Sequence, residues 1–129
     1  MYRRLFFILL AAAAVSLALA GCSGAKSGAV GAVQAYYQAI LSQNAAQLKS
    51  VTCPDFQATA QTELDSFQGV KTELQGFSCK ETGQQGAATL VKCDGKIVAT
   101  YGSDKMDFPL ADRVHQVQNQ GGVWKVCGY

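Results

Sequence analysis

A short apolar run near the N-terminus constrains this 129-residue chain most, because it decides the compartment in which the rest must fold. Arg3 and Arg4 precede an apolar stretch from Leu5 to Ala20 that only Ser16 interrupts. A basic start followed by a short apolar segment with small residues at its end is typical of a secretory signal peptide. The run has roughly 16 residues, fewer than the roughly 20 that a transmembrane helix needs. We therefore predict that the chain is exported.

The end of this run carries a second signal. Leu19-Ala20-Gly21-Cys22 resembles the bacterial lipobox, in which the cysteine receives a diacylglyceryl group and the signal is cleaved before it. The resemblance implies a lipoprotein signal peptide over residues 1–21 and acyl chains such as palmitate on Cys22. Two or three acyl chains, at about 0.8 kcal/mol per buried CH₂ group, give a durable membrane anchor. The expected location is the extracytoplasmic side of the cell membrane or outer membrane. A coincidental cysteine after an ordinary signal peptide is the alternative.

The charge balance of the remaining chain argues against a nucleic-acid partner. Eleven Lys and Arg stand against nine Asp and Glu, and loss of Arg3 and Arg4 with the signal leaves nine of each. A neutral chain lacks the basic surface that nucleic-acid binding requires. Residues 22–30 are rich in Gly and Ser, which predicts a lipidated tether that holds the domain on the order of 15 Å from the lipid.

Four cysteines remain once Cys22 is set aside, namely Cys53, Cys79, Cys93 and Cys127. An even number in a small exported domain predicts two disulfides. No C-x-x-C pair is present, so we expect no zinc site. Asp104, Asp107 and Asp112 lack the ligand density and the glycine of a calcium-binding loop, and no phosphate-binding motif is present, so we expect no other metal and no cofactor.

The pairing of the cysteines depends on a predicted hairpin. A two-residue loop at Gln84-Gln85 places Cys79 opposite Leu90 and needs positive φ at both glutamines. A three-residue loop at 85–87 uses Gly86 instead and places Cys79 across from Cys93, within reach of a disulfide. We favour Cys79–Cys93 and, for the remaining pair, Cys53–Cys127, although four cysteines allow three connectivities.

The pattern of apolar residues predicts helices first and strands afterwards. Three- and four-residue steps indicate one long helix or two consecutive ones over residues 30–51, with a break at Ser42-Gln43-Asn44, and Cys53-Pro54 ends this region. Asp55 is the expected N-cap of a further helix that ends at Gly69. From there we predict strands at about 71–80, 87–101, 106–118 and 123–127, with a bulge or a turn at Asp94-Gly95. The fold class is α+β, with N-terminal helices packed on a curved antiparallel sheet of about four strands over residues 31–129.

Two segments resemble the nuclear-transport-factor-2-like superfamily, a cone-shaped α+β fold. Ala32-Val33-Gln34-Ala35-Tyr36-Tyr37-Gln38-Ala39-Ile40 is similar to the aromatic-rich first helix of those proteins, and Gly121-Gly122-Val123-Trp124-Lys125-Val126 is similar to their closing strand. The resemblance covers roughly residues 30–127, and small bacterial lipoproteins within the superfamily look most similar. It implies a concave sheet whose pocket different members use for ligand binding, subunit contact or catalysis.

Tyr36, Tyr37 and His115 are the candidate pocket residues. Enzymes of the superfamily use Tyr, His and Asp side chains, but no spacing in this chain matches a catalytic pattern, and no catalytic residue is assigned. A lone histidine on a strand is more often a packed residue than a base. We therefore predict a non-enzymatic domain that binds a small apolar ligand or an envelope protein. A small isomerase- or hydratase-like enzyme and a structural lipoprotein that forms homodimers are the alternatives.

Overall fold

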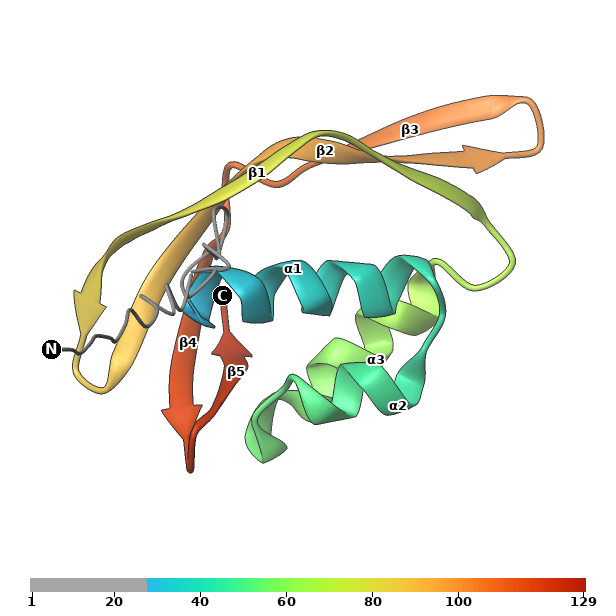
Figure 1. The fold of residues 1–129 in the computed structure, drawn as a ribbon. Coiled ribbons are helices and arrows are strands. Elements are labelled where there is room, and N and C mark those ends of the chain that lie inside the picture. The colour runs from blue at the N-terminus through green and yellow to red at the C-terminus, as the bar shows by residue number, and fades with distance from the viewer. Residues whose placement is uncertain (1–27) are drawn as a thin grey trace, which may run out of the picture.

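The computed structural model describes residues 28–129, so the predicted signal peptide, Cys22 and residues 23–27 lie outside the described part (Figure 1). Helices precede a five-stranded antiparallel sheet, which confirms the α+β class. None of the helices in this part of the chain is long and apolar enough to cross a membrane. The helical elements are α1 (Gly28–Leu41), α2 (Ala45–Ser50), the 3₁₀ turn η1 (Pro54–Phe56) and α3 (Gln57–Ser66). The strands are β1 (Lys71–Gln85), β2 (Ala88–Tyr101), β3 (Asp104–Pro109), β4 (Val114–Gln120) and β5 (Val123–Gly128).

The first helical region divides where the sequence predicts a break. Gln43 takes a φ of 56°, and the Asn44 side chain caps α2 by accepting a hydrogen bond from the Gln47 N–H at 3.0 Å. Helix α1 begins at Gly28, so residues 28–30 are helical although the predicted tether includes them. The buried face of α1 supplies much of the core, through Ala29, Val30, Ala32, Val33, Tyr36, Tyr37, Ala39 and Ile40.

The start of α3 differs from the prediction. Asp55 is not an N-cap, because residues 54–56 form a 3₁₀ turn that leads directly into the helix and places Asp55 inside helical backbone. Phe56 occupies the cap position without a capping side-chain hydrogen bond. Proline explains the difference, since its fixed φ suits the first residue of a helical turn. The apolar side chains of this region, Phe56, Ala60, Leu64 and Phe67, are buried.

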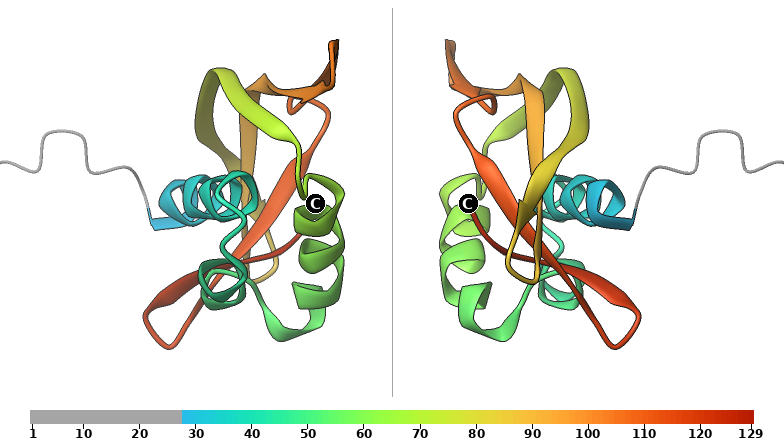
Figure 2. Two further views of the ribbon diagram at one scale, coloured as in Figure 1. Left: turned by 90° about the vertical axis from the view of Figure 1, so that its right-hand side faces the viewer. Right: turned by 90° about the vertical axis from the view of Figure 1, so that its left-hand side faces the viewer.

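Strand β2 is the centre of the sheet. It pairs with β1 along one side, and with β4 and then β3 along the other, while β5 pairs with β4. Helix α1 lies across the concave side of the bent sheet (Figure 1), and the side views of Figure 2 show β1 and β2 arching above it. The core forms between them, where Val33, Tyr37 and Ile40 of α1 meet Val91, Ile97, Val117 and Val126 of the strands.

A bulge of β1 opposite Gly95 produces the bend of the sheet. The register of β1 against β2 shifts between Gln75 and Ser78, so that Gly76 and Phe77 stand opposite Gly95. Gly95 has a φ of 98°, and a Cβ there would lie 2.5 Å from the Gln75 carbonyl oxygen, so only glycine fits. A bulge does lie at the predicted place in the sheet, but its extra residue is on β1, at Gly76-Phe77, and Asp94-Gly95 is the partner side.

The strand predicted at 106–118 is two strands, which makes five instead of about four. Strand β3 ends at Pro109, and β4 starts only at Val114. Between them the Leu110 N–H donates to the Gly95 carbonyl at 3.0 Å, which anchors the crossover at the bend. Pro109 has no N–H to continue the ladder, and the bend moves the partner strand away, so one straight strand cannot form there.

Both predicted disulfides form, although the hairpin loop differs from the prediction. Cys79 stands directly opposite Cys93 and is bonded to it, and Cys53 is bonded to Cys127. The loop has two residues, Gly86 and Ala87, because Gln85 pairs with Ala88. A second register shift between Glu81 and Gly83 leaves Thr82 unpaired and restores the alignment of Cys79 with Cys93. The prediction therefore gave the right disulfide with the wrong loop.

Candidate functional site

The structure brings the three candidate pocket residues together in the centre of the protein. Tyr36 and Tyr37 are neighbours on α1, and His115 is the second residue of β4. All three side chains are fully buried. The Tyr37 hydroxyl lies 2.8 Å from His115 Nε2, and the Tyr36 and Tyr37 rings meet edge to face at 5.4 Å. The curved sheet and the helices enclose all three side chains, so none of them faces an open pocket.

The hydrogen bonds of His115 define its protonation. Its Nδ1 lies 3.3 Å from the Val91 carbonyl oxygen, which can only accept, so Nδ1 carries the proton. Burial lowers the pKa of His115 to about 4, because the charged ring would be desolvated. The imidazole is therefore neutral near pH 7, and Nε2 accepts a hydrogen bond from the Tyr37 hydroxyl. Both ring nitrogens are occupied by protein partners.

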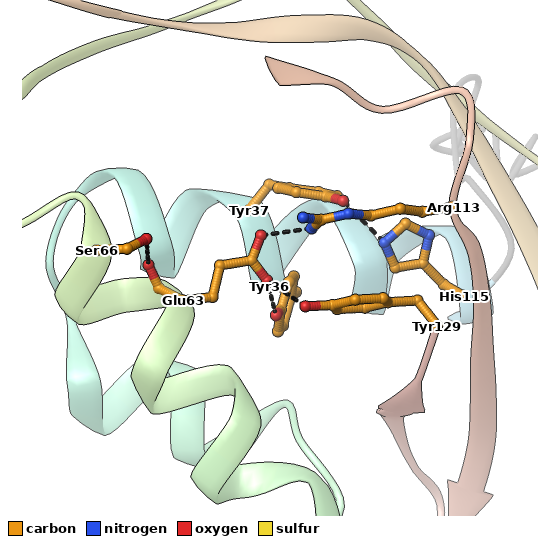
Figure 3. Close-up of polar contacts among 7 residues, drawn as sticks. All are labelled: Tyr36, Tyr37, Glu63, Ser66, Arg113, His115 and Tyr129. Atoms are coloured by element: carbon orange, nitrogen blue, oxygen red, sulfur yellow. Dashed lines mark hydrogen bonds and ion pairs between the residues drawn. The ribbon is translucent and has the colours of Figure 1, made fainter.

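A second set of polar residues, which the sequence analysis missed, centres on Glu63 of α3 (Figure 3). The Tyr36 hydroxyl donates to Glu63 Oε2 at 2.6 Å, and the Tyr129 hydroxyl donates to the same oxygen at 3.1 Å. Arg113 Nη1 donates to Oε1 at 2.5 Å. One carboxylate thus joins α1, the loop before β4 and the C-terminal residue. We call Tyr36, Tyr37, Glu63, Arg113, His115 and Tyr129 the central cluster.

The protonation states within the central cluster are fixed by burial and by Glu63. Burial raises the pKa of Tyr36 above its usual range, and the Glu63 charge raises it further. Burial also raises the pKa of Tyr37, although the nearby Arg113 charge opposes that shift. For Arg113, burial alone lowers the pKa, but the hydrogen bond to Glu63 and its charge outweigh it, so the pKa is raised. The two phenols therefore remain hydroxyl donors and Arg113 remains a cation.

Tyr129 closes the central cluster toward solvent. The Arg113 guanidinium carbon lies 4.4 Å from the centre of its ring, a cation–π contact. The other contacts of the ring are with Phe56 at 5.4 Å and His115 at 5.8 Å. Tyr129 itself is 42% exposed, so it forms the outer wall of the cluster.

Two surface hollows flank the ion pair of Glu63 and Arg113 and share these residues and Ser66 as lining. The smaller one, of about 140 Å³, is mainly apolar and is completed by Phe67, Ile97, Phe108, Pro109 and Leu110; we call it the notch. The larger one, of about 450 Å³, is completed by Thr59, Thr62 and Tyr129; we call it the groove. The groove and the notch are lined by the outer residues of the central cluster and not by Tyr37 or His115.

One sequence signal could have identified Glu63. It lies three residues after Ala60 and one before Leu64, inside the apolar stripe of α3, where an acidic residue needs a buried partner. Arg113 and Tyr129 lie outside any periodic pattern, so nothing in the sequence marked them. Within residues 28–129, no group of three His, Cys, Asp or Glu side chains could hold a metal ion.

No known protein-family model matches this chain, and no curated protein matches it either.

The ion pair between Glu63 and Arg113 should stabilise the fold more than an exposed pair of equal length. Its side chains are 9% and 32% exposed, whereas those of Asp107 and Lys96, also 2.5 Å apart, are 50% and 39% exposed. Removing one partner of a mostly buried pair leaves an uncompensated charge. We expect Glu63→Gln to lower the free energy of unfolding by about 2 kcal/mol, but Asp107→Asn by under about 1 kcal/mol. Double-mutant cycles of both pairs in denaturant test this, and equal coupling energies would contradict it.

His115 should make stability depend on pH in a defined window. The unfolded chain takes up a proton near pH 6.5, but folded His115 does so only near pH 4. Because the unfolded state gains this proton first, the free energy of unfolding should be highest above about pH 6.5 and should decrease as the pH falls toward 4. The total decrease that His115 causes should be about 3 kcal/mol. We expect His115→Gln to lose this pH dependence and Tyr37→Phe, which keeps the buried histidine, to retain it. Denaturant unfolding between pH 4 and 7.5 measures both variants, and a parallel pH profile for His115→Gln would refute the assignment.

Proposed function

We propose that this protein is a lipid-anchored, extracytoplasmic, non-enzymatic domain that binds a segment of another envelope protein at the groove and the notch. The signal layout of residues 1–21 and the lipobox-like sequence before Cys22 support the anchor. Helices on the concave side of a bent sheet agree with the resemblance to the nuclear-transport-factor-2-like superfamily, which we retain as a proposal. That fold alone does not decide the activity.

The burial of Tyr37 and His115 carries the choice of binding over catalysis. A general base must come within about 3 Å of the proton that it removes from a substrate. Both nitrogens of His115 already contact Val91 and Tyr37, and neither side chain is exposed. The hydrogen bonds of Tyr37 and His115 therefore support a structural role for these two residues. Contacts with a binding partner are left to the outer residues of the central cluster, Glu63, Arg113 and Tyr129.

The groove and the notch suit a protein segment better than an enclosed small molecule. A cavity of about 150 Å³ holds one benzene-sized group, so the notch fits a single apolar side chain. The adjoining groove offers Thr59, Thr62 and the partly exposed Arg113 guanidinium to backbone carbonyl groups. One anchoring side chain with polar contacts around it is the usual pattern of a binding hot spot.

Intact-mass analysis of the membrane-extracted protein tests the anchor. We expect a chain that starts at Cys22 and carries acyl mass, with a gain of roughly 4 Da on reduction, two hydrogens for each disulfide. Cys22→Ser should move the protein from the membrane fraction to the soluble fraction. A chain that begins elsewhere or has no acyl mass would rule out the anchor without affecting the binding proposal.

Short blocked peptides test the binding surface. In a series acetyl-Gly-X-Gly-amide, we expect X as Leu or Phe to shift NMR signals of Ile97 and Phe108 in the notch, and X as Gly to leave them unchanged. Ser66→Tyr, which places a ring over the notch, should abolish the shifts. Gln68→Tyr is the matched control, because Gln68 is exposed and lines neither hollow.

Two results would contradict the binding proposal. One is peptide binding that is independent of X or insensitive to Ser66→Tyr. The other is turnover of a small metabolite that His115→Gln or Tyr37→Phe abolishes while the fold persists, which would favour the isomerase- or hydratase-like alternative.

A further inference from the structure

The place where the N-terminal segment leaves the described fold is fixed by a tight contact. Gly28, the first residue of α1, lies directly against the indole of Trp124, and a Cβ added at Gly28 would overlap that ring. Trp124 is the second residue of β5 and packs against the core. Any segment that precedes Gly28 therefore enters the fold beside the start of β5.

The lipid proposed on Cys22 must lie close to this point. Five residues separate Cys22 from Gly28, and a fully extended chain spans at most about 3.5 Å per residue, so the two lie within about 20 Å of each other. The inference below rests on the proposed lipid anchor. In Figure 1 the β2–β3 hairpin lies at the opposite end of the molecule from the start of α1.

The side chains at this end suit a membrane surface. Val123 is an apolar residue that is 50% exposed, and Trp124 and Lys125 beside it are partly exposed. Tryptophan is enriched at the level of the lipid headgroups, and lysine is attracted to anionic headgroups. We infer that the end of the domain formed by Gly28, Val123, Trp124 and Lys125 rests on the bilayer that holds the lipid anchor. The β2–β3 hairpin then projects away from the membrane.

Trp124 offers a direct test, because it is the only tryptophan in the chain. The full-length lipidated protein is reconstituted into vesicles of phosphatidylethanolamine and phosphatidylglycerol, with or without bromine on the acyl chains. Bromine quenches only tryptophan that lies near the lipid. We expect brominated vesicles to quench Trp124 at least roughly twofold more than they quench a tryptophan placed at the β2–β3 hairpin. That reporter comes from the double variant Trp124→Phe/Tyr101→Trp, since Tyr101 ends β2 at the β2–β3 hairpin and is 39% exposed.

A matched pair of charge variants keeps the native reporter. Val123 and Met106 are apolar strand residues of nearly equal exposure, 50% and 52%. Val123→Glu should reduce the quenching of Trp124, because it places a negative charge against anionic headgroups. Met106→Glu, on β3, should leave the quenching unchanged.

The outcomes separate the orientation from the anchor. If acyl mass is present and Trp124 is not quenched, or the tryptophan at position 101 is quenched as strongly, the orientation is wrong and the anchor stands. Equal effects of Val123→Glu and Met106→Glu also overturn the orientation. If the protein carries no acyl mass and does not bind the vesicles, the proposed anchor fails and the orientation fails with it.

Discussion

The carboxylate of Glu63 is the interaction on which the arrangement of helices and sheet depends. It accepts hydrogen bonds from Tyr36 on α1, from Arg113 before β4 and from the C-terminal Tyr129, while its own backbone belongs to α3. A buried carboxylate without such donors would cost several kcal/mol. The three segments must therefore converge on α3 together, which selects one packing of helices against strands. Apolar contacts alone are less demanding, since a core tolerates many packings of similar volume.

The burial of the central cluster explains why a substrate has no access to its inner residues. Tyr37 and His115 form a pair with the elements of an acid–base site, but the curved sheet packs His115 directly against Tyr37 of α1, and both side chains are fully buried. Neither side chain lines the groove or the notch. The groove stays accessible, because Arg113, Ser66 and Tyr129 reach the solvent there. The binding that we propose at the groove and the notch needs no motion of the core.

The sequence predicted local features well and long-range ones poorly. The break at Ser42-Gln43-Asn44 and the irregularity of the sheet near Gly95 follow from residue chemistry within a few positions, and the structure has both. Cys79 does pair with Cys93, but through a different loop from the one predicted. Asp55 failed as a cap because Pro54 began a helical turn one residue earlier. The hydrogen bonds of the central cluster join residues 27 to 78 positions apart, and no periodic pattern records such contacts. Of the residues that the prediction missed, only Glu63 could have been identified from the sequence, because it is a charged residue inside the apolar stripe of α3.

The disulfides account for how a small domain tolerates a buried polar centre. Polar and ionic groups in a core favour one packing more than they add stability, because their desolvation offsets much of their mutual attraction. Cys79–Cys93 and Cys53–Cys127 span 14 and 74 residues, and loops of those lengths lose about 3 and about 4 kcal/mol of unfolded-chain entropy. The longer one also lies beside the Thr52–Val126 bridge, which ties the end of the first helical region to β5. The two disulfides, which need an oxidising compartment to form, thus add stability to a domain whose size alone would give it a small free energy of unfolding.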